Sequence, residues 1–216
     1  MIGLVGGVAA GKSTAAGEFA RLGAAVVDGD AIGHRLLGAP AVQRAIRRRW
    51  GARVFSLGQR GSPARGRADS PGRDAAVDRA ALGRIVFADP RELAALDGIL
   101  HPRIRREMTR QIAAARRKAS VPAVVVDAAV LFEAGWDDLC TAVVFVDSPA
   151  SARARRAASG KGWHRARWRK RENSQISLDK KRRNSDYIMD NSFGVSRLRD
   201  QVRQIFLKIV HAADRP

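Results

Sequence analysis

Five short apolar runs, separated by longer stretches with helical patterns, organise this chain. They are rich in valine and alanine and span residues 2–5, 24–27, 123–126, 142–146 and 187–189. Nearly continuous apolar content predicts strands that are buried on both faces, as in a parallel sheet. Strands that alternate with helices indicate βαβ units, so we predict an α/β fold with a parallel five-stranded sheet.

Helical patterns cover most of the remaining chain. Between the second and third apolar runs, the predicted helices span residues 40–50, 78–87 and 90–118. Ser148 followed by Pro149 predicts an N-cap and the first turn of another helix. A last helix is expected to pack one apolar stripe on the sheet, because its apolar residues recur at helical spacing. These residues are Val195, Leu198, Val202, Ile205, Phe206 and Ile209.

Residues 6–14 read Gly-Gly-Val-Ala-Ala-Gly-Lys-Ser-Thr and follow the first apolar run. Gly-x4-Gly-Lys-Ser, between a strand and a helix, is the spacing of a phosphate-binding P-loop. Gly6 and Gly11 permit turns that aim amide N–H groups inward, and the helix adds the positive end of its dipole. Lys12 is expected to reach the β- and γ-phosphates, and the Ser13 hydroxyl to bind Mg²⁺. The alternative is a glycine-rich turn before an ordinary helix.

The loop therefore predicts a nucleoside triphosphate as substrate. The residues expected to bind ATP here are Ala9, Ala10, Gly11, Lys12, Ser13 and Thr14. An Asn-Lys-x-Asp guanine-reading motif is missing from the sequence, and 216 residues are too few for a motor core. A small-molecule kinase is the class these features favour.

Carboxylates end two of the predicted strands. Asp28 and Asp30 follow the second run, and Asp127 follows the third. Ligands of open α/β sheets bind at the carboxyl ends of the strands, where an acceptor hydroxyl needs a carboxylate to take its proton. Asp127 is placed to act on Mg²⁺ in the way of a Walker B carboxylate. Each of these residues could instead cap a helix or a strand end.

Composition limits the other classes of protein. A length of 216 residues suits one α/β domain. The sequence contains no run of about 18 apolar residues, so we expect no membrane span, and we see no secretory leader. A single cysteine, Cys140, excludes an internal disulfide and is compatible with the cytoplasm. The formal charge of +19 is mostly arginine spread over the chain, typical of an Arg- and Ala-rich genome, so we predict no nucleic-acid partner. The sequence specifies no oligomeric state.

Several separated segments resemble the dephospho-coenzyme A kinase family, and the resemblance runs from end to end. They are GLVGG at 3–7, GKST at 11–14, LGA at 22–24, VDGDAIGH at 27–34, FADP at 87–90, LHPRI at 100–104, LFEAG at 131–135 and DYIMDNS at 186–192. The resemblance implies transfer of a phosphoryl group from ATP to the ribose 3'-hydroxyl of dephospho-coenzyme A. It also implies a three-layer P-loop fold with a helical substrate-binding insertion and a lid.

The resemblance assigns roles to particular residues. Asp30 is expected to be the base at the acceptor hydroxyl, with Asp28 beside it in the phosphate and metal region. Arg155 looks like the lid arginine that approaches the transferred phosphoryl group, although Arg153 and Arg156 are its neighbours. The residues expected to bind the acceptor are Asp30, His34 and His101. Asn191 is expected to join the residues that bind ATP. The residues expected to bind the metal ion are Ser13, Asp28 and Asp127.

The resemblance also divides the single domain into parts. The core comprises residues 1–30, 119–148 and 185–216, and the lid comprises residues 149–184. A helical acceptor-binding part spans 31–118 and contains a Gly-, Pro- and Arg-rich segment, 56–74, that we predict to be a poorly ordered insertion.

Some features depart from the family or have a second interpretation. Ala129 stands where the family usually has proline, and the lid is unusually basic and contains Trp163 and Trp168. A P-loop kinase of another nucleotide or nucleoside is the first alternative function. The interleaved arginine and tryptophan residues leave a nucleic-acid-binding module as a second. His101 followed by Pro102 could mark the end of a helix.

Overall fold

The computed structural model describes residues 1–56 and 76–213. The predicted insertion at 56–74 therefore lies outside the described residues, except for Ser56. The chain forms two compact units, one of Met1–Ile32 with Ile104–Pro216 and one of Gly33–Arg103. Helices α2 (Gly29–Leu36) and α5 (Pro90–Arg116) each contribute residues to both units.

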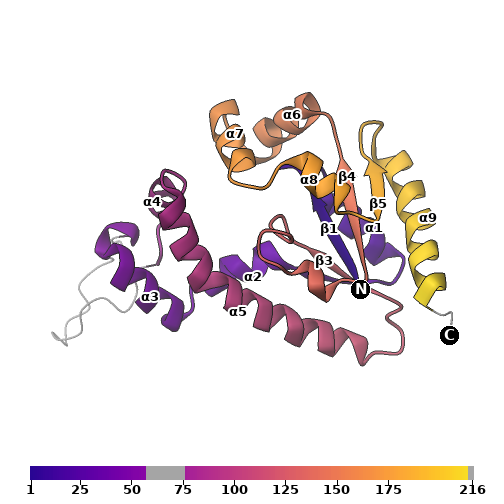
Figure 1. The fold of residues 1–216 in the computed structure, drawn as a ribbon, viewed down its shortest axis with the longest axis horizontal. Coiled ribbons are helices and arrows are strands. Elements are labelled where there is room, and N and C mark those ends of the chain that lie inside the picture. The colour runs from indigo at the N-terminus through magenta and orange to yellow at the C-terminus, as the bar shows by residue number, and fades with distance from the viewer. Residues whose placement is uncertain (57–75, 214–216) are drawn as a thin grey trace, which may run out of the picture. The chain divides into compact units, whose positions relative to one another are not determined.

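A parallel five-stranded sheet in the order β2-β3-β1-β4-β5 forms the centre of the first unit (Figure 1). The strands are β1 (Ile2–Gly6), β2 (Ala25–Asp28), β3 (Val124–Asp127), β4 (Ala142–Asp147) and β5 (Tyr187–Asp190). Each predicted apolar run is confirmed to within one residue at either end. Because the strands are parallel, their carboxyl ends lie at one edge of the sheet.

Burial on both faces holds for the three central strands but is wrong for the edge strands. The apolar residues of β1, β3 and β4 are buried. In contrast, Val26 in β2 and Ile188 in β5 are 38% and 44% exposed. Both strands lie at the ends of the strand order, so each has a neighbouring strand on one side only.

Helices α1 (Lys12–Arg21) and α9 (Val195–Ala213) pack on one face of the sheet. The rings of Phe19 and Phe206 meet edge-on with their centroids 6.0 Å apart. The predicted apolar stripe of the last helix joins this core, apart from the exposed Val195. On the opposite face, Leu131 packs beside Gly3, where a Cβ atom would lie 2.8 Å from the Leu131 side chain.

Three helices and a short 3-10 turn complete the first unit. They are α6 (Ala150–Lys161), α7 (Arg165–Asn173), α8 (Leu178–Arg183) and the 3-10 turn η2 (Asp137–Leu139). The prediction that Ser148 caps α6 is wrong, because Pro149 occupies the cap position without a side-chain bond. Ser148 Oγ instead accepts from Arg156 Nη1 at 2.9 Å.

The second unit has a small helical core of its own. Its elements are α3 (Pro40–Trp50), the 3-10 turn η1 (Ala52–Val54), α4 (Arg79–Val86) and the first part of α5. Asp78 caps α4 by accepting from the N–H groups of Ala80 and Ala81. Helix α5 continues through Pro102, so the interpretation of His101-Pro102 as a helix end is wrong.

A charged pair is buried in the first unit. Lys181 in α8 is fully buried, and its Nζ lies 2.9 Å from Glu133 Oε1. The ammonium also donates to the Ala129 carbonyl at 2.7 Å and to Gln175 Oε1 at 2.9 Å. Burial lowers the pKa of Lys181, and the Glu133 carboxylate opposes that shift. The pair therefore ties α8 to the segment that follows β3.

Glu133→Gln is expected to lower the free energy of unfolding by about 3–5 kcal/mol, because it removes the one carboxylate in contact with the buried Lys181 ammonium among the described residues. Denaturant unfolding at neutral pH measures the loss. Glu107→Gln is the matched control, since Glu107 pairs with Arg110 on the surface of α5 and should lose less than about 1 kcal/mol. Equal losses in the two variants would contradict the role assigned to the buried pair.

Candidate active site

The P-loop links β1 to α1 and contains three residues with positive φ. Gly6 has φ 152°, Gly11 has φ 101° and Ala9 has φ 61°. A Cβ atom on Gly6 would lie 2.6 Å from the Val146 carbonyl oxygen, so a larger residue would clash with β4. Gly11 is the N-cap of α1 without a side-chain cap, which leaves the first N–H groups of the helix for an anion.

Lys12 is buried at the start of α1 and reaches back along the loop. Its Nζ donates to the carbonyls of Gly6 and Gly7, both at 3.2 Å. The ammonium is therefore held at the Gly7 end of the loop. This is the end at which a P-loop lysine meets the β- and γ-phosphates of a nucleotide.

The three predicted carboxylates lie at the same edge of the sheet. Asp28 and Asp127 pair in register at the ends of β2 and β3, and Asp30 lies in the first turn of α2. Asp28 Oδ1 accepts from the Ala31 N–H at 2.8 Å, so it also has the capping role that was its alternative. Asp127 is buried and accepts from Ser13 Oγ at 3.1 Å.

The electrostatics of Asp127 reflect this crowding. Burial is the main cause that raises the pKa of Asp127, and the nearby carboxylates of Asp30 and Asp28 raise it further. The Lys12 ammonium and the Ser13 hydroxyl act in the opposite direction. The chain thus gathers three acids, one ammonium and one hydroxyl around the start of α1.

This donor set suits Mg²⁺, which prefers oxygen ligands. In the part of the chain that the structure describes, no group of three or more His, Cys, Asp or Glu side chains is arranged to hold a metal ion. Mg²⁺ in a nucleotide site needs only one or two protein ligands, because phosphates and water supply the rest. The Ser13 and Asp127 pair fits that requirement.

Two lid arginines contact the loop, and Arg155 is not one of them. Arg153 is 4% exposed, and its Nη1 lies so close to Gly7 that a Cβ atom there would be at 2.3 Å. Arg156 donates to the Ala10 carbonyl at 3.3 Å and to the Asn191 carbonyl at 2.9 Å. The Arg155 side chain is exposed on the other side of α6.

Asn191 holds the loop from the end of β5. Its Nδ2 donates to the Ala10 carbonyl at 2.8 Å and would lie 2.1 Å from a Cβ atom on Gly11. The side chain is buried. The contact that the structure gives to this predicted ATP-binding residue is therefore with the P-loop backbone.

The predicted acceptor residues His34 and His101 belong to the second unit. His34 Nε2 lies 3.0 Å from Arg79 Nη2, and His101 Nε2 lies 3.3 Å from Asp97 Oδ1. Both contacts are within that unit. The acceptor-binding role of the two histidines stays a prediction.

The sequence analysis missed two residues of α7 at the loop. Trp168 is 6% exposed, and its Nε1 donates to the Val8 carbonyl at 3.3 Å. Glu172 Oε2 accepts from the Val8 N–H at 3.3 Å and pairs with Arg153 Nη1. A signal was present, since Glu172 is the single acidic residue between Asp147 and Asp179.

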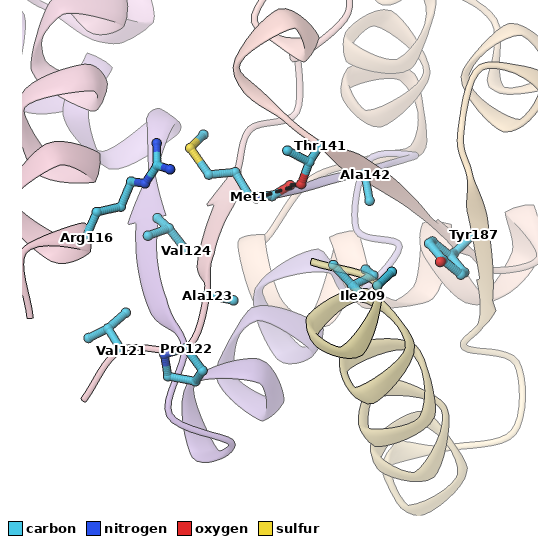
Figure 2. A pocket seen from close by; sticks show the side chains of 11 residues that line it. Met1, Arg116, Val121, Pro122, Ala123, Val124, Thr141, Ala142, Tyr187 and Ile209 are labelled. Carbon is cyan, nitrogen blue, oxygen red and sulfur yellow. Dashed lines mark hydrogen bonds between the residues drawn. The ribbon is translucent and has the colours of Figure 1, made fainter. Parts of the chain in front are cut away.

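A cavity of about 510 Å³ lies at the opposite edge of the sheet (Figure 2). It is lined by the amino ends of the strands, with Met1 bound to Thr141 on one side and Arg116 on another. Since β1 runs from this edge to the P-loop, the cavity is separate from the phosphate site.

A parallel sheet in this order, whose first strand runs into a phosphate-binding loop, defines a P-loop nucleotide-binding protein. The family model for dephospho-CoA kinase matches residues 1–196. The dephospho-CoA kinase of Symbiobacterium thermophilum is 39% identical over 203 residues, covering 94% of this chain and 78% of the relative. The chain therefore belongs to the dephospho-CoA kinase family, as the resemblance predicted.

Solved structures agree on the fold. The crystal structure of a Thermus thermophilus protein has a TM-score of 0.74 at 26% identity and covers 96% of each chain. Dephospho-CoA kinase from Campylobacter jejuni has a TM-score of 0.62 at 23% identity and covers 98% of each chain. No helix among the described residues is long and apolar enough to cross a membrane.

Asp127→Asn is expected to raise the melting temperature at neutral pH. Burial outweighs the attraction of the Lys12 ammonium, so the pKa of Asp127 is raised and its ionised form costs folding free energy. That cost develops as the pH rises from the ordinary pKa through the folded one. Asparagine removes the cost, and each kcal/mol gained corresponds to about 2–4 °C. The gain should shrink as the pH falls and Asp127 becomes protonated.

Thermal unfolding at pH 7.5 and pH 4.5 measures this difference. Asp28→Asn is the control, because Asp28 is exposed and caps α2, so the weakened cap offsets the relief of its repulsion with Asp127 and the variant should gain less than Asp127→Asn. A lower melting temperature of Asp127→Asn at pH 7.5 would contradict the argument.

Proposed function

We propose that this chain transfers the γ-phosphoryl group of ATP to the ribose 3'-hydroxyl of dephospho-CoA, giving CoA and ADP. This is the last step of coenzyme A synthesis, and the cytoplasm is its proposed compartment. The observation that carries the proposal is the Ser13–Asp127 hydrogen bond beside Lys12, in a member of the dephospho-CoA kinase family. It joins the P-loop to the acidic edge of the sheet.

The P-loop and its lysine position the triphosphate. The N–H groups of the loop and of the first turn of α1 bind phosphate oxygens, and Lys12 moves from its loop carbonyls toward the β- and γ-phosphates. Ser13 and Asp127 would hold Mg²⁺, with Asp28 beside them. The ion would supply positive charge to the phosphate oxygens when bound.

Asp30 is the proposed base. As the 3'-oxygen forms its bond to the γ-phosphorus, the bond from that phosphorus to the β–γ bridging oxygen breaks, and ADP leaves. The Asp30 carboxylate takes the proton of the 3'-hydroxyl. Asp30 is exposed and lies close enough to Asp127 and Lys181 to influence the pKa of both.

Arg153 is the proposed arginine at the transferred group, in place of Arg155. Its guanidinium lies on Gly7, at the end of the loop that Lys12 also reaches. Two cations there would compensate the charge that spreads over the phosphoryl oxygens during transfer. His34 and His101 remain the proposed residues that bind the acceptor.

The tryptophans of the lid support the alternative function, a nucleic-acid-binding module, less well than they support the kinase. Trp168 is buried against the P-loop, and the guanidinium groups of Arg167 and Arg171 cover the Trp163 ring at 5.1 and 5.5 Å. Stacking on bases needs an open aromatic face.

Asp30→Asn is expected to lower kcat by about 10²–10⁴-fold while ATP still binds, because the variant loses only the proton acceptor. A coupled assay of ADP release, with and without dephospho-CoA, measures the loss. Asp28→Asn serves as the comparison. If Asp28→Asn loses turnover and Asp30→Asn keeps it, the role of the base belongs to Asp28. Wild-type turnover that does not depend on dephospho-CoA would refute the proposed function, and other nucleosides and nucleotides would then be screened as acceptors.

Arg153→Gln is expected to lower kcat by at least about tenfold, because it removes one charge at the phosphoryl end of the loop. Arg155→Gln is the matched control on the same helix and should stay within about twofold of the wild type. Steady-state kinetics with saturating ATP compares the two variants. The opposite ranking would return the role to Arg155.

A further inference from the structure

Helix α7 binds both polar groups of one P-loop residue. Trp168 donates its indole N–H to the Val8 carbonyl at 3.3 Å, and Glu172, one turn later, accepts from the Val8 N–H at 3.3 Å. The same Glu172 oxygen pairs with the Arg153 guanidinium. A carboxylate thus lies among donors that belong to the phosphate site.

The contact is built into the packing of the lid. Val8, Ala157 and Trp168 form a small buried cluster, and the Arg153 guanidinium lies 5.5 Å from the Trp168 ring centroid. Arg153 Nε also donates to the Ser148 carbonyl at 2.9 Å, which fixes the side chain. Gly7 makes room for the guanidinium, because a Cβ atom there would lie 2.3 Å from Nη1.

The carboxylate lies at the end of the loop that receives the outermost phosphate. Lys12, which meets the β- and γ-phosphates in a P-loop, hydrogen-bonds to the Gly7 carbonyl next to Val8. Glu172 and a γ-phosphate are both anions, and they would therefore compete for the Arg153 guanidinium and the Val8 N–H. At the few ångströms that separate neighbouring groups in a partly buried site, their repulsion is substantial.

We propose that Glu172 is a positioning residue that senses the γ-phosphate. Its carboxylate holds Arg153 and the Val8 N–H, and a nucleoside triphosphate displaces it, which transfers Arg153 to the phosphate and releases the Glu172 end of α7 from the loop, while Trp168 keeps its bond to the Val8 carbonyl. A nucleoside diphosphate, which lacks the outermost charge, displaces it less. The inference rests on the proposed ATP site and adds a link between the lid and the phosphate count of the nucleotide.

Calorimetric titration of the full chain with ATP and with ADP, both with Mg²⁺ and without acceptor, tests the proposal. Glu172→Gln keeps the shape of the side chain and removes the competing charge. Its affinity for ATP is expected to rise by at least about fivefold relative to the wild type, and its affinity for ADP by a smaller factor. The ratio of the two affinities is the decisive quantity, because a purely structural role would not change it.

Asp179→Asn is the matched control, since Asp179 is an exposed acid at the start of α8 and its loss changes the net charge equally. It should leave the ratio of ATP to ADP affinity unchanged. Glu172→Ala repeats the test with a different shape, in case the glutamine variant folds poorly.

An unchanged or lower ATP to ADP affinity ratio in both Glu172 variants would overturn the inference. The dephospho-CoA-dependent ADP release of the wild type is measured separately, so the proposed function can stand when the inference fails. A wild type that binds neither nucleotide would overturn both.

Discussion

Two carbonyl groups of the phosphate-binding loop, those of Val8 and Ala10, are held by side chains from distant parts of the chain. The Ala10 carbonyl accepts from Asn191 and Arg156, and the Val8 carbonyl accepts from Trp168. A loop with three residues at positive φ has many other conformations when it is unfolded, so it needs such bonds to keep one. With the carbonyls bound from outside, the loop can direct N–H groups toward an anion.

Charge balance is the second requirement of the site. Asp127 is buried beside Lys12, and Arg153 beside Glu172, so each buried charge has an opposite charge near it. Elsewhere, many of the basic side chains lie on the surface. Some of them pair with a nearby acid, as Arg105 does with Asp138. The net charge of +19 therefore creates a positive electrostatic potential around the protein, which favours the approach of polyanionic substrates. The fit of those substrates depends on the few buried pairs.

The sheet could be predicted because burial dictates composition. Strands that lie between two layers must be apolar at nearly every position, and this is a signal that a single sequence carries. Helix α7 carries no such signal, because six of its nine residues are charged and its contacts with the loop come from Trp168 and Glu172. Its position depends on tertiary partners that local patterns do not reveal.

The choice among the lid arginines illustrates the same limit. In an α-helix, Arg155 lies about 200° around the axis from Arg153, whereas Arg156 and Ala157 lie within about 60° of it. The buried Ala157 marks the inner face, but alternating alanine and arginine give no apolar stripe from which to identify it. Arginine can bury its aliphatic stem, and Arg153 is buried because its guanidinium is paired with Glu172, so hydrophobicity alone could not select the face.

The α7 contact has a thermodynamic consequence for catalysis. If the γ-phosphate displaces Glu172, linkage requires that the docked lid weaken the binding of ATP by the same factor by which ATP weakens docking. Part of the binding energy of the triphosphate is then used to free Arg153, at the moment when that charge is useful. After transfer, the loop holds ADP with less negative charge at the Val8 end, and Glu172 can recover Arg153 and the Val8 N–H. The return of Glu172 to the loop would then favour the diphosphate product over the substrate.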